Sequence, residues 1–405
     1  MVARRGKVPT RGQTLQGARS RVRADAAIRE DEDINASIAG LLLDLSALQE
    51  GPRALAYKRA AHAVLGLAQP VSSLRNGPGL AKIPYVGPSS ERVILEYLDT
   101  GQSSTVTRAI DESGQPDLVA ARRALRGDFI SQATAEAVLA LPSHGLVTLA
   151  DYCGDFQMHS TWSDGGQTLE RIVEGARALG HKCAGVTDHG YGLPIASGMS
   201  MEAVSRQHAA IDAINDLHRG DFRLFKGIEA NIRADGQIDM EPGELRRFEF
   251  VVASPHSALR SRADQTARMA GAVSQPFVDI LGHPRGRRYD VRPGVSADWA
   301  QVFAIAAERR VAVEIDGYPD RQDIDWSLAA AALDAGCLFA LDSDAHATEE
   351  LLFSRMAVAH ARLAGIPADR VINCWSNERL EEWMNRPERT NSVASRTSTV
   401  NRCLP

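Results

Sequence analysis

The sequence has little of what a membrane or secreted protein needs. Its 405 residues contain no apolar run of about 18 residues, the length required for a membrane-spanning helix. The N-terminus is basic but lacks the apolar stretch of a signal peptide. The five cysteines form no Cys-x-x-Cys pair, which argues against a disulfide framework or a thiolate zinc knuckle. We therefore expect a cytoplasmic protein with reduced cysteines and no membrane partner.

The chain also has no overall excess of positive charge. Its formal net charge of −5 excludes a wholly basic nucleic-acid coat protein, but not a local basic surface. In residues 1–30, a cluster of Lys and Arg precedes the first acidic residue, Asp25, and apolar side chains are few. We expect this segment to be a disordered tail that either binds nucleic-acid phosphates or only aids solubility.

Two hydrophobic patterns divide the rest of the chain. In residues 31–105, apolar side chains recur at helical spacing, and Gly and Pro separate the short helices. Residues 106–150 are predicted to be a helical linker, and residues 387–405 a loose tail. In residues 151–386, short β-rich runs alternate with helical segments, which predicts repeated β-α units around a parallel sheet.

The predicted elements of this last region can be given by number. The strands are residues 183–186, 222–228, 248–252, 278–281, 311–315 and 338–341. The helices between them are residues 169–179, 201–217, 297–309 and 328–335.

Side chains that bind metals follow most of these strands. Because the carboxyl ends of parallel strands meet on one face, we expect these side chains to share one cleft. Imidazole and carboxylate ligands without thiolates favour Zn²⁺, Mn²⁺ or Fe²⁺ over Ca²⁺. Their number exceeds the ligands of one ion and predicts two or three ions, which could clamp a phosphoryl group and lower the pKa of a bound water. The residues are Gln157, His159, Asp164, Asp188, His189, Glu229, His256, His283, Asp342, Asp344 and His346.

A single histidine after a strand is more often structural than a metal ligand. Five histidines at successive strand ends are not explained in this way. The other six histidines lie outside this pattern, and we expect them to be structural or on the surface: His62, His144, His181, His208, His218 and His360.

Residues 151–386 resemble the PHP (polymerase and histidinol phosphatase) domain family. The matching segments occur in family order: GDFQMHSTWSDG at 154–165, TDH at 187–189, GIE at 227–229, SPHS at 254–257, GHP at 282–284 and DSDAH at 342–346. The resemblance implies an α/β fold, a distorted (β/α)₇ barrel, with three metal ions.

The resemblance also implies a role for each residue. Around the first ion it places Gln157, His159, Glu229 and Asp344. Glu229 bridges to a second ion held by His256 and His283, and a third ion is held by Asp164, His189 and His346. We expect His159, Glu229, His256 and Asp344 to be essential for catalysis. Asp155 and Asp188 have no ligand position and are expected to form hydrogen bonds to the imidazoles.

The segment Gln157-Met158-His159 departs from the usual His-x-His of the family. An amide oxygen is a weaker and harder ligand than an imidazole, which should shift the first site from Zn²⁺ toward Mn²⁺. The same Gln resembles PHP domains attached to bacterial family X DNA polymerases, so it does not by itself indicate an inactive site.

Three arginines follow the GHP segment. Arg285, Arg287 and Arg288 are candidate phosphate-binding residues, because a guanidinium can hold two phosphate oxygens at once. The alternative is a charged loop that faces solvent.

Residues 33–101 resemble the small helix-hairpin-helix domain of family X DNA polymerases. The hairpin Ile83-Pro84-Tyr85-Val86-Gly87 can present backbone N–H groups to a DNA phosphate, although an ordinary turn between helices fits the segment alone. We assign Tyr85, Val86 and Gly87 as candidate DNA contacts. Tyr85 replaces the usual hairpin glycine, and Val93 stands where eukaryotic relatives have a Schiff-base lysine, so we expect no lyase chemistry of that kind.

The linker of residues 106–150 is too short for a polymerase palm and lacks an Asp-x-Asp run. We therefore expect a phosphoesterase dependent on two or three Mn²⁺ or Zn²⁺ ions, which acts on DNA as a 3′–5′ exonuclease or 3′-end-processing enzyme without polymerase activity. One alternative is a histidinol-phosphatase-like enzyme for small phosphomonoesters. Another is a non-catalytic DNA-binding protein with a degenerate metal site.

Overall fold

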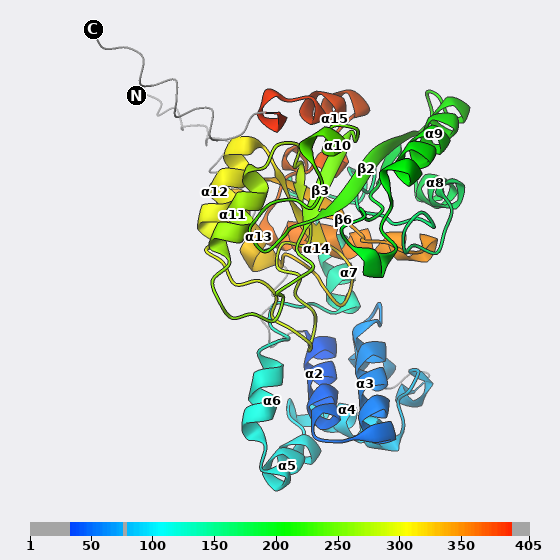
Figure 1. Cartoon of the computed structure of the whole chain (residues 1–405). Helices are drawn as coiled ribbons and strands as arrows, with labels where there is room; N and C mark the ends of the chain where they lie inside the picture. The colour runs from blue at the N-terminus through cyan, green and yellow to red at the C-terminus, as the bar shows by residue number, and fades with distance from the viewer. Residues whose placement is uncertain (1–32, 76–78, 391–405) are drawn as a thin grey trace, which may run out of the picture.

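The computed structural model describes residues 33–75 and 79–390. The expected basic tail of residues 1–30 lies outside the described residues. Figure 1 shows a group of helices, coloured blue to cyan, beneath a larger barrel coloured green to red. In the described part of the chain, no helix is both long enough and apolar enough to span a bilayer.

The described residues of the helical part form five α-helices around an apolar core. Its helices are α2 (Ile34–Ala47), α3 (Gly51–Leu65), α4 (Pro88–Thr100), α5 (Ser104–Ser113) and α6 (Pro116–Arg123), with the short turns η2 (Val71–Leu74) and η3 (Leu80–Lys82) before α4. Ile38, Leu42 and Ile94 are fully buried in this core. The Asp33 side chain caps α2 by accepting a hydrogen bond from the Ala36 amide at 2.9 Å.

The barrel is built on six parallel strands in sequential order. They are β1 (Cys183–Val186), β2 (Arg223–Asn231), β3 (Phe250–Ser254), β4 (Ile280–Leu281), β5 (Ala312–Asp316) and β6 (Leu338–Asp342). Nearly all of their residues are buried, which explains why these strands appear in the sequence as continuous apolar runs.

An extended segment around Met158 closes the barrel between β1 and β6. On one side, the Asp155 and Met158 carbonyls each accept a hydrogen bond, at 2.8 Å, from amides of Gly185 and Thr187. On the other side, the His159 amide donates to the Ala345 carbonyl at 2.8 Å, and Met158 pairs in parallel with Ala345. The expected (β/α)₇ barrel, preceded by a small helical region, is therefore confirmed.

Helices cover the outside of this barrel (Figure 1). They are α7 (Gln132–Ala140), α8 (Leu169–Ala178), α9 (Met201–Leu217), α10 (Pro242–Leu245), α11 (Thr266–Ser274), α12 (Trp299–Arg309), α13 (Trp326–Ala335), α14 (Ser354–Ala364) and α15 (Asn377–Met384). The sequence analysis did not predict α11, α14 or α15. In α14 every residue except Arg355 is buried, including the polar His360 and Arg362, so polar residues in its sequence do not mark a side that faces solvent.

The segment expected to be a linker packs against both parts of the molecule. Val106 of α5 belongs to the apolar core of the helical part. Val138 of α7 packs with Met356 and Leu363 of the barrel helix α14. At the other end of the chain, Arg389 is buried and binds Asp279, so the segment expected to be loose is packed at its start, residues 387–390.

Buried ion pairs join the helical part to the loop that follows β4. Arg126 lies 2.7 Å from Asp44 of α2 and 2.7 Å from Asp290 of this loop. Arg122 of α6 lies 2.5 Å from the other oxygen of Asp290. Tyr289, next to Asp290, is buried in the apolar core of the helical part. The helical part is thus held against the loop that begins at His283.

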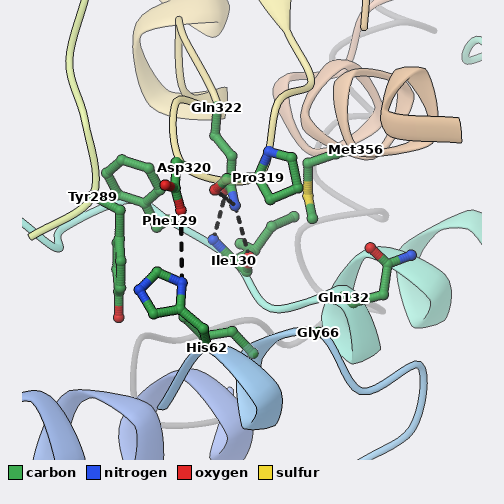
Figure 2. A pocket seen from close by; sticks show the side chains of 11 residues that line it. His62, Gly66, Phe129, Ile130, Gln132, Tyr289, Pro319, Asp320, Gln322 and Met356 are labelled. Atoms are coloured by element: carbon green, nitrogen blue, oxygen red, sulfur yellow. Dashed lines mark hydrogen bonds and ion pairs between the residues drawn. The ribbon is translucent and has the colours of Figure 1, made fainter. Parts of the chain in front are cut away.

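The loop that follows β5 makes a second connection, shown in Figure 2. The Gln322 side chain pairs with the backbone of Ile130 through two hydrogen bonds of 2.9 Å. His62 of α3 lies 3.8 Å from Asp320, across a small pocket of about 100 Å³. Both connections involve loops at the carboxyl ends of strands, so the helical part sits at the end of the barrel where the candidate site lies.

Candidate metal centre

All nine predicted metal ligands lie at the carboxyl end of the barrel. Gln157 and His159 lie in the closing segment, and Asp164 in the turn that follows it. His189 follows β1, Glu229 lies near the end of β2, His256 follows β3, and His283 follows β4. Asp344 and His346 follow β6. The structure brings together residues that span 190 positions of the sequence.

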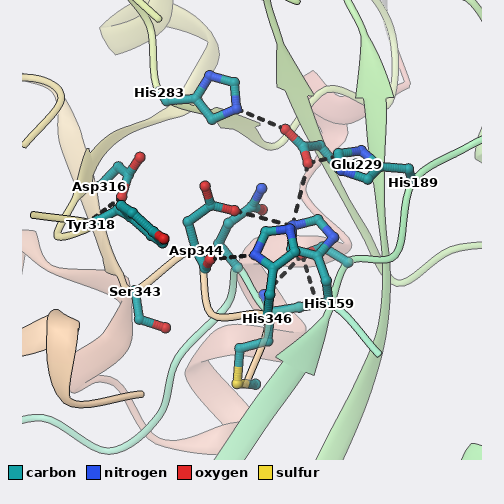
Figure 3. A network of polar contacts seen from close by, with 12 residues as sticks. His159, His189, Glu229, His283, Asp316, Tyr318, Ser343, Asp344 and His346 are labelled. Atoms are coloured by element: carbon teal, nitrogen blue, oxygen red, sulfur yellow. Dashed lines mark hydrogen bonds and ion pairs between the residues drawn. The ribbon is translucent and has the colours of Figure 1, made fainter. Parts of the chain in front are cut away.

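Glu229 is the centre of this group, as Figure 3 shows. One of its oxygens lies 3.0 Å from His283 Nε2 and 3.4 Å from His256 Nε2. The other lies 3.1 Å from His189 Nδ1 and 3.5 Å from His159 Nε2. This carboxylate has one oxygen for each side of the site, which is the geometry that a bridging ligand needs.

Asp344 and Asp164 flank this centre. Asp344 Oδ1 lies 3.1 Å from His159 Nε2. The Asp164 carboxylate lies 3.8 Å from His159, 3.7 Å from His189 and 3.6 Å from His346. The His159 ring stacks between the rings of His189 and His346, with centroids 4.5 and 4.4 Å apart.

Two sets of potential ligand atoms lie within 4.8 Å of one another in this part of the barrel. One is His159, Asp164, His189 and His346, and the other is His189, Glu229 and His256. These sets share His189. They partly follow the grouping implied by the family resemblance, which kept His159 with Glu229 and Asp344. The division of ligands among ions stays a prediction.

Unsatisfied polar atoms show that the residues fit a cation. Gln157 is fully buried, yet neither its amide oxygen nor its amide nitrogen has a hydrogen-bond partner. The Nδ1 atoms of His159 and His283 are also without hydrogen bonds. Buried polar atoms in proteins are normally satisfied, and a bound ion is one explanation of such exceptions.

The acidic groups beneath the centre add to this picture. Burial, with nearby carboxylates, raises the pKa of Glu314 and of Asp316 well above the ordinary range. Burial also raises the pKa of Asp342 to about 6. Taken out of water without enough cations nearby, these carboxylates favour the protonated form. Divalent ions at this end of the barrel would relieve the excess of negative charge.

The histidines differ from one another in basicity. Burial lowers the pKa of His189 to about 4, so its ring is neutral at pH 7 and able to bind a metal. Burial acts in the same direction on His346, but the hydrogen bond to Asp164 and the charge of Asp344 raise the pKa of His346 to about 9. A cation bound at Asp164 would have to displace that proton.

Backbone geometry at two candidate ligands is unusual. His283 has a φ of 22° and Asp344 a φ of 52°, a region that residues with a Cβ rarely adopt. Such conformations are found most often where function requires a side chain to point in one direction. Gly165 is required nearby, since a Cβ there would lie 2.2 Å from the His159 carbonyl oxygen.

Asp155 and Asp188 do not contact imidazoles, contrary to the sequence-based expectation. Asp188 accepts hydrogen bonds from the Ser160 amide at 2.8 Å and from Gln207 at 2.6 Å. Asp155 accepts one from the Gln157 amide at 3.1 Å. These carboxylates therefore hold the backbone beside His159 and Gln157, because amides rather than imidazoles are within their reach.

The structure also corrects the assignment of the arginines. Arg287 is buried, stacks on Phe129 at 3.9 Å, and donates to the Gln322 carbonyl at 2.7 Å, so it is not available to a phosphate. Arg285 lies 3.0 Å from Asp325, and Arg288 lies 3.4 Å from Asp320. Each of the three arginines already has a protein partner.

Sequence reasoning missed Arg321, which contacts the site directly. Its Nη2 atom lies 3.0 Å from Asp344 Oδ2, and its Nε lies 3.7 Å from Asp316 at the end of β5. Asp316 follows the predicted strand 311–315, so the strand-end rule could have found it. Arg321 lies five residues further along, in the loop that contacts the helical part, and no spacing rule identifies it.

The hairpin residues lie in the helical part, outside this centre. Val86 is buried, whereas Tyr85 and Gly87 are exposed at the start of α4. Val93, in the position of the lyase lysine, is fully buried in the apolar core.

Comparison with curated proteins gives relatives that match more than half of this chain. The chain is 30% identical over 254 residues to a probable phosphatase of Serratia proteamaculans, a match that covers 58% of this chain and 95% of the relative. This chain belongs to the PHP family. It is also 27% identical over 233 residues to the probable phosphatase YcdX of Escherichia coli, covering 55% of this chain and 90% of that protein. No known family profile matches the sequence.

A larger relative combines two activities in its name. The chain is 31% identical over 242 residues to the DNA polymerase/3′-5′ exonuclease PolX of Bacillus subtilis, covering 60% of this chain but only 42% of PolX. The expected similarity to PHP-containing family X polymerases is confirmed. Among solved structures, a histidinol phosphate phosphatase from Lactococcus lactis, complexed with zinc, L-histidinol and phosphate, aligns with a TM-score of 0.41 and 16% identity, over 52% of this chain and 94% of that one.

Proposed function

We propose that this PHP-family hydrolase is a metal-dependent phosphoesterase that removes nucleotides or blocking groups from the 3′ ends of DNA, without polymerase activity. The observation that carries this proposal is the position of the helical part. The loops that follow β4 and β5 connect it to the end of the barrel that holds the candidate ligands, through Asp290 and Asp320 respectively. A substrate bound by the helical part therefore lies near the phosphoesterase site.

The residues of the centre suit phosphoester hydrolysis. Bound divalent ions would polarise a phosphoryl oxygen and lower the pKa of a water molecule. Gln157, His159, Glu229 and Asp344 would hold one ion, and the remaining predicted ligands the others. Arg321 carries a positive charge beside Asp344, within the centre itself, and can hold a phosphoryl oxygen there.

The similarity to PolX supports DNA as the substrate, and Tyr85 and Gly87 are exposed directly before α4, where a phosphate could bind; Val86 is buried between them. Exonuclease polarity and the choice of 3′ ends are part of this proposal. So is the absence of polymerase activity, which follows from the short and largely packed segment between the helical part and the barrel.

A second candidate is a phosphatase for small phosphomonoesters. The matches to the probable phosphatases of Serratia and Escherichia cover 95% and 90% of those proteins. The helical part could then be structural, because its contacts with Tyr289 and Asp290 support a loop of the site.

An assay of the full chain with Mn²⁺ tests the proposal. One arm offers a 3′-labelled oligonucleotide, and the other offers histidinol phosphate, each repeated with His256→Ala and with His144→Gln as an exposed control. We expect the oligonucleotide label to be lost with the parent and the control, but not with His256→Ala. Phosphate release from the small ester alone would favour the second candidate, and no release in either arm would contradict both. Deleting residues 1–105 would not replace this test of DNA binding. The deletion removes Asp44, the partner of Arg126, and the apolar core around Tyr289, so it would also disturb the loop that follows β4.

A further inference from the structure

The tip of the hairpin before α4 exposes two adjacent side chains, Pro84 and Tyr85. Ile83 and Val86 are buried, at 4% and 8% exposure, and the Val86 amide donates a hydrogen bond to the Ile83 carbonyl at 3.1 Å. Because these two residues are buried, Pro84 and Tyr85 between them lie at the surface. Tyr85 is 63% exposed, although most of its side chain is an apolar ring.

The backbone conformation of Tyr85 is unfavourable for a residue with a Cβ, so folding stability alone does not explain an exposed tyrosine at this position. Its φ of 63° lies in the left-handed region, which glycine adopts easily and a tyrosine does not. An exposed ring recovers little free energy from burial that could offset this conformation. An aromatic side chain at such a position is better explained by binding than by folding.

A positively charged side chain lies beside the ring. The guanidinium carbon of Arg59, on α3, is 5.5 Å from the centroid of Tyr85. Arg59 is exposed, and among the described residues no acidic group forms an ion pair with it. Arg75 of the same helical part, in contrast, pairs with Asp99 at 2.5 Å. The tip therefore offers an aromatic face together with a cation that has no acidic partner in the described part of the chain.

We propose that Tyr85 and Arg59 form a stacking site for one unpaired base of a DNA strand. The ring would stack on the base, and the guanidinium would pair with the adjoining phosphate. Every base presents a flat aromatic face, so the site would bind single-stranded regions, such as gaps and frayed ends, without reading sequence. This inference rests on the proposed function, and it adds a preference for unpaired DNA.

Binding by the full-length protein tests the site. Fluorescence anisotropy would measure affinity for a labelled single strand and for a blunt duplex. Metal is left out of these samples so that the DNA is not cleaved. The variants are Tyr85→Gly, Tyr85→Phe and Arg59→Gln, and Tyr191→Ala removes an exposed tyrosine of the barrel as a control. A second single strand carries 2-aminopurine, whose fluorescence falls when the base stacks on an aromatic ring.

We expect Tyr85→Gly to weaken single-strand binding on the order of 10-fold and to abolish the quenching of 2-aminopurine, with duplex binding unchanged. Tyr85→Phe should keep both properties, and Arg59→Gln should weaken binding and its dependence on salt. The melting temperature of Tyr85→Gly should not fall, because glycine suits the backbone at this position.

Three results would overturn the inference. Single-strand binding and quenching by Tyr85→Gly equal to those of the parent would show that the ring is not a stacking site. An equal loss of duplex binding would show that the tip contacts the DNA backbone only. A parent protein that binds no DNA but still releases phosphate from a small ester would overturn both this inference and the nucleic-acid part of the proposed function.

Discussion

The two ends of the barrel differ in how many cationic side chains contact their buried carboxylates. At the amino end, Asp279 precedes β4 and is fully buried, but it lies 2.7 Å from Arg386 and 3.0 Å from Arg389. At the carboxyl end, the buried carboxylates outnumber the cations that contact them, and Arg321 contacts both Asp344 and Asp316. At the amino end, arginines compensate the buried negative charge. At the carboxyl end, part of the buried negative charge has no compensating side chain.

This difference separates structure from function. A buried ion pair with all its hydrogen bonds fixes two elements together, here β4 and the C-terminal segment around Arg389. Buried carboxylates that lack enough counter-charge cost stability, and they are retained where a cation or a substrate completes them. The contrast explains why a buried aspartate joins two elements at the amino end, as Asp279 does, but is a candidate metal ligand at the carboxyl end, as Asp344 is.

Substitutions at the carboxyl end should give the largest effects on turnover. We expect Asp344→Ala and His256→Ala each to lower kcat for phosphoester hydrolysis by at least about 100-fold, because each removes a predicted ligand. Circular dichroism and thermal melting should show a folded barrel in both. Retention of full activity by both variants would sink the metal assignment.

The amino end should respond in the reverse manner. Asp279→Ala leaves two buried arginines without their partner and should lower the free energy of unfolding by about 3–5 kcal/mol. Urea denaturation would measure this change, and the folded fraction should retain its activity per molecule. A variant as stable as the parent would show that the two ends do not differ as described.

Metal should stabilise only through the carboxyl end. Free Mn²⁺ at about 100 times its Kd should raise the free energy of unfolding by about 2.7 kcal/mol per site. Asp279→Asn should keep this response, and Asp344→Ala should lose part of it. Gln157→His should shift the preference toward Zn²⁺, and an unchanged preference would exclude Gln157 as a ligand.

A smaller effect should distinguish a satisfied buried histidine from those of the site. His360 accepts a hydrogen bond from the Trp326 amide at 3.0 Å and lies 2.8 Å from Gln322. Burial lowers the pKa of His360 to about 3. Because the unfolded chain takes up a proton near its ordinary pKa of about 6.5, stability that is present above that pH is lost as the pH falls toward 3.

Urea denaturation at pH 7.5 and pH 5 would measure this loss. Its part from His360 should be about 2 kcal/mol and should be absent in His360→Gln. His144→Gln, a change at an exposed histidine, should leave the pH dependence as it is. An identical pH dependence in His360→Gln and the parent would contradict the assignment of a neutral, buried ring.

Most of the candidate site was accessible from the sequence, because strand ends of a parallel barrel converge by geometry. The motif segments predicted where His159, Glu229 and His283 would meet, and the strand 183–186 and the helix 201–217 match β1 and α9 at both ends.

What the sequence could not show depends on contacts between distant residues. Arg287 resembles any loop arginine until Phe129, far away in the chain, is seen stacked on it. Arg321 acquires its role because its loop folds back toward Asp344. Asp188 was expected near imidazoles, but the amides of a neighbouring turn lie closer.

We expect divalent cations to complete the carboxyl end of the barrel. Titration of metal-free protein with Mn²⁺, followed by electron paramagnetic resonance, counts bound ions directly. The parent should bind two or three ions per chain, Asp344→Ala and His256→Ala should bind fewer, and Asp279→Asn should bind the parent number. A parent protein that binds no ion, or a count unchanged by Asp344→Ala and His256→Ala, would contradict this expectation.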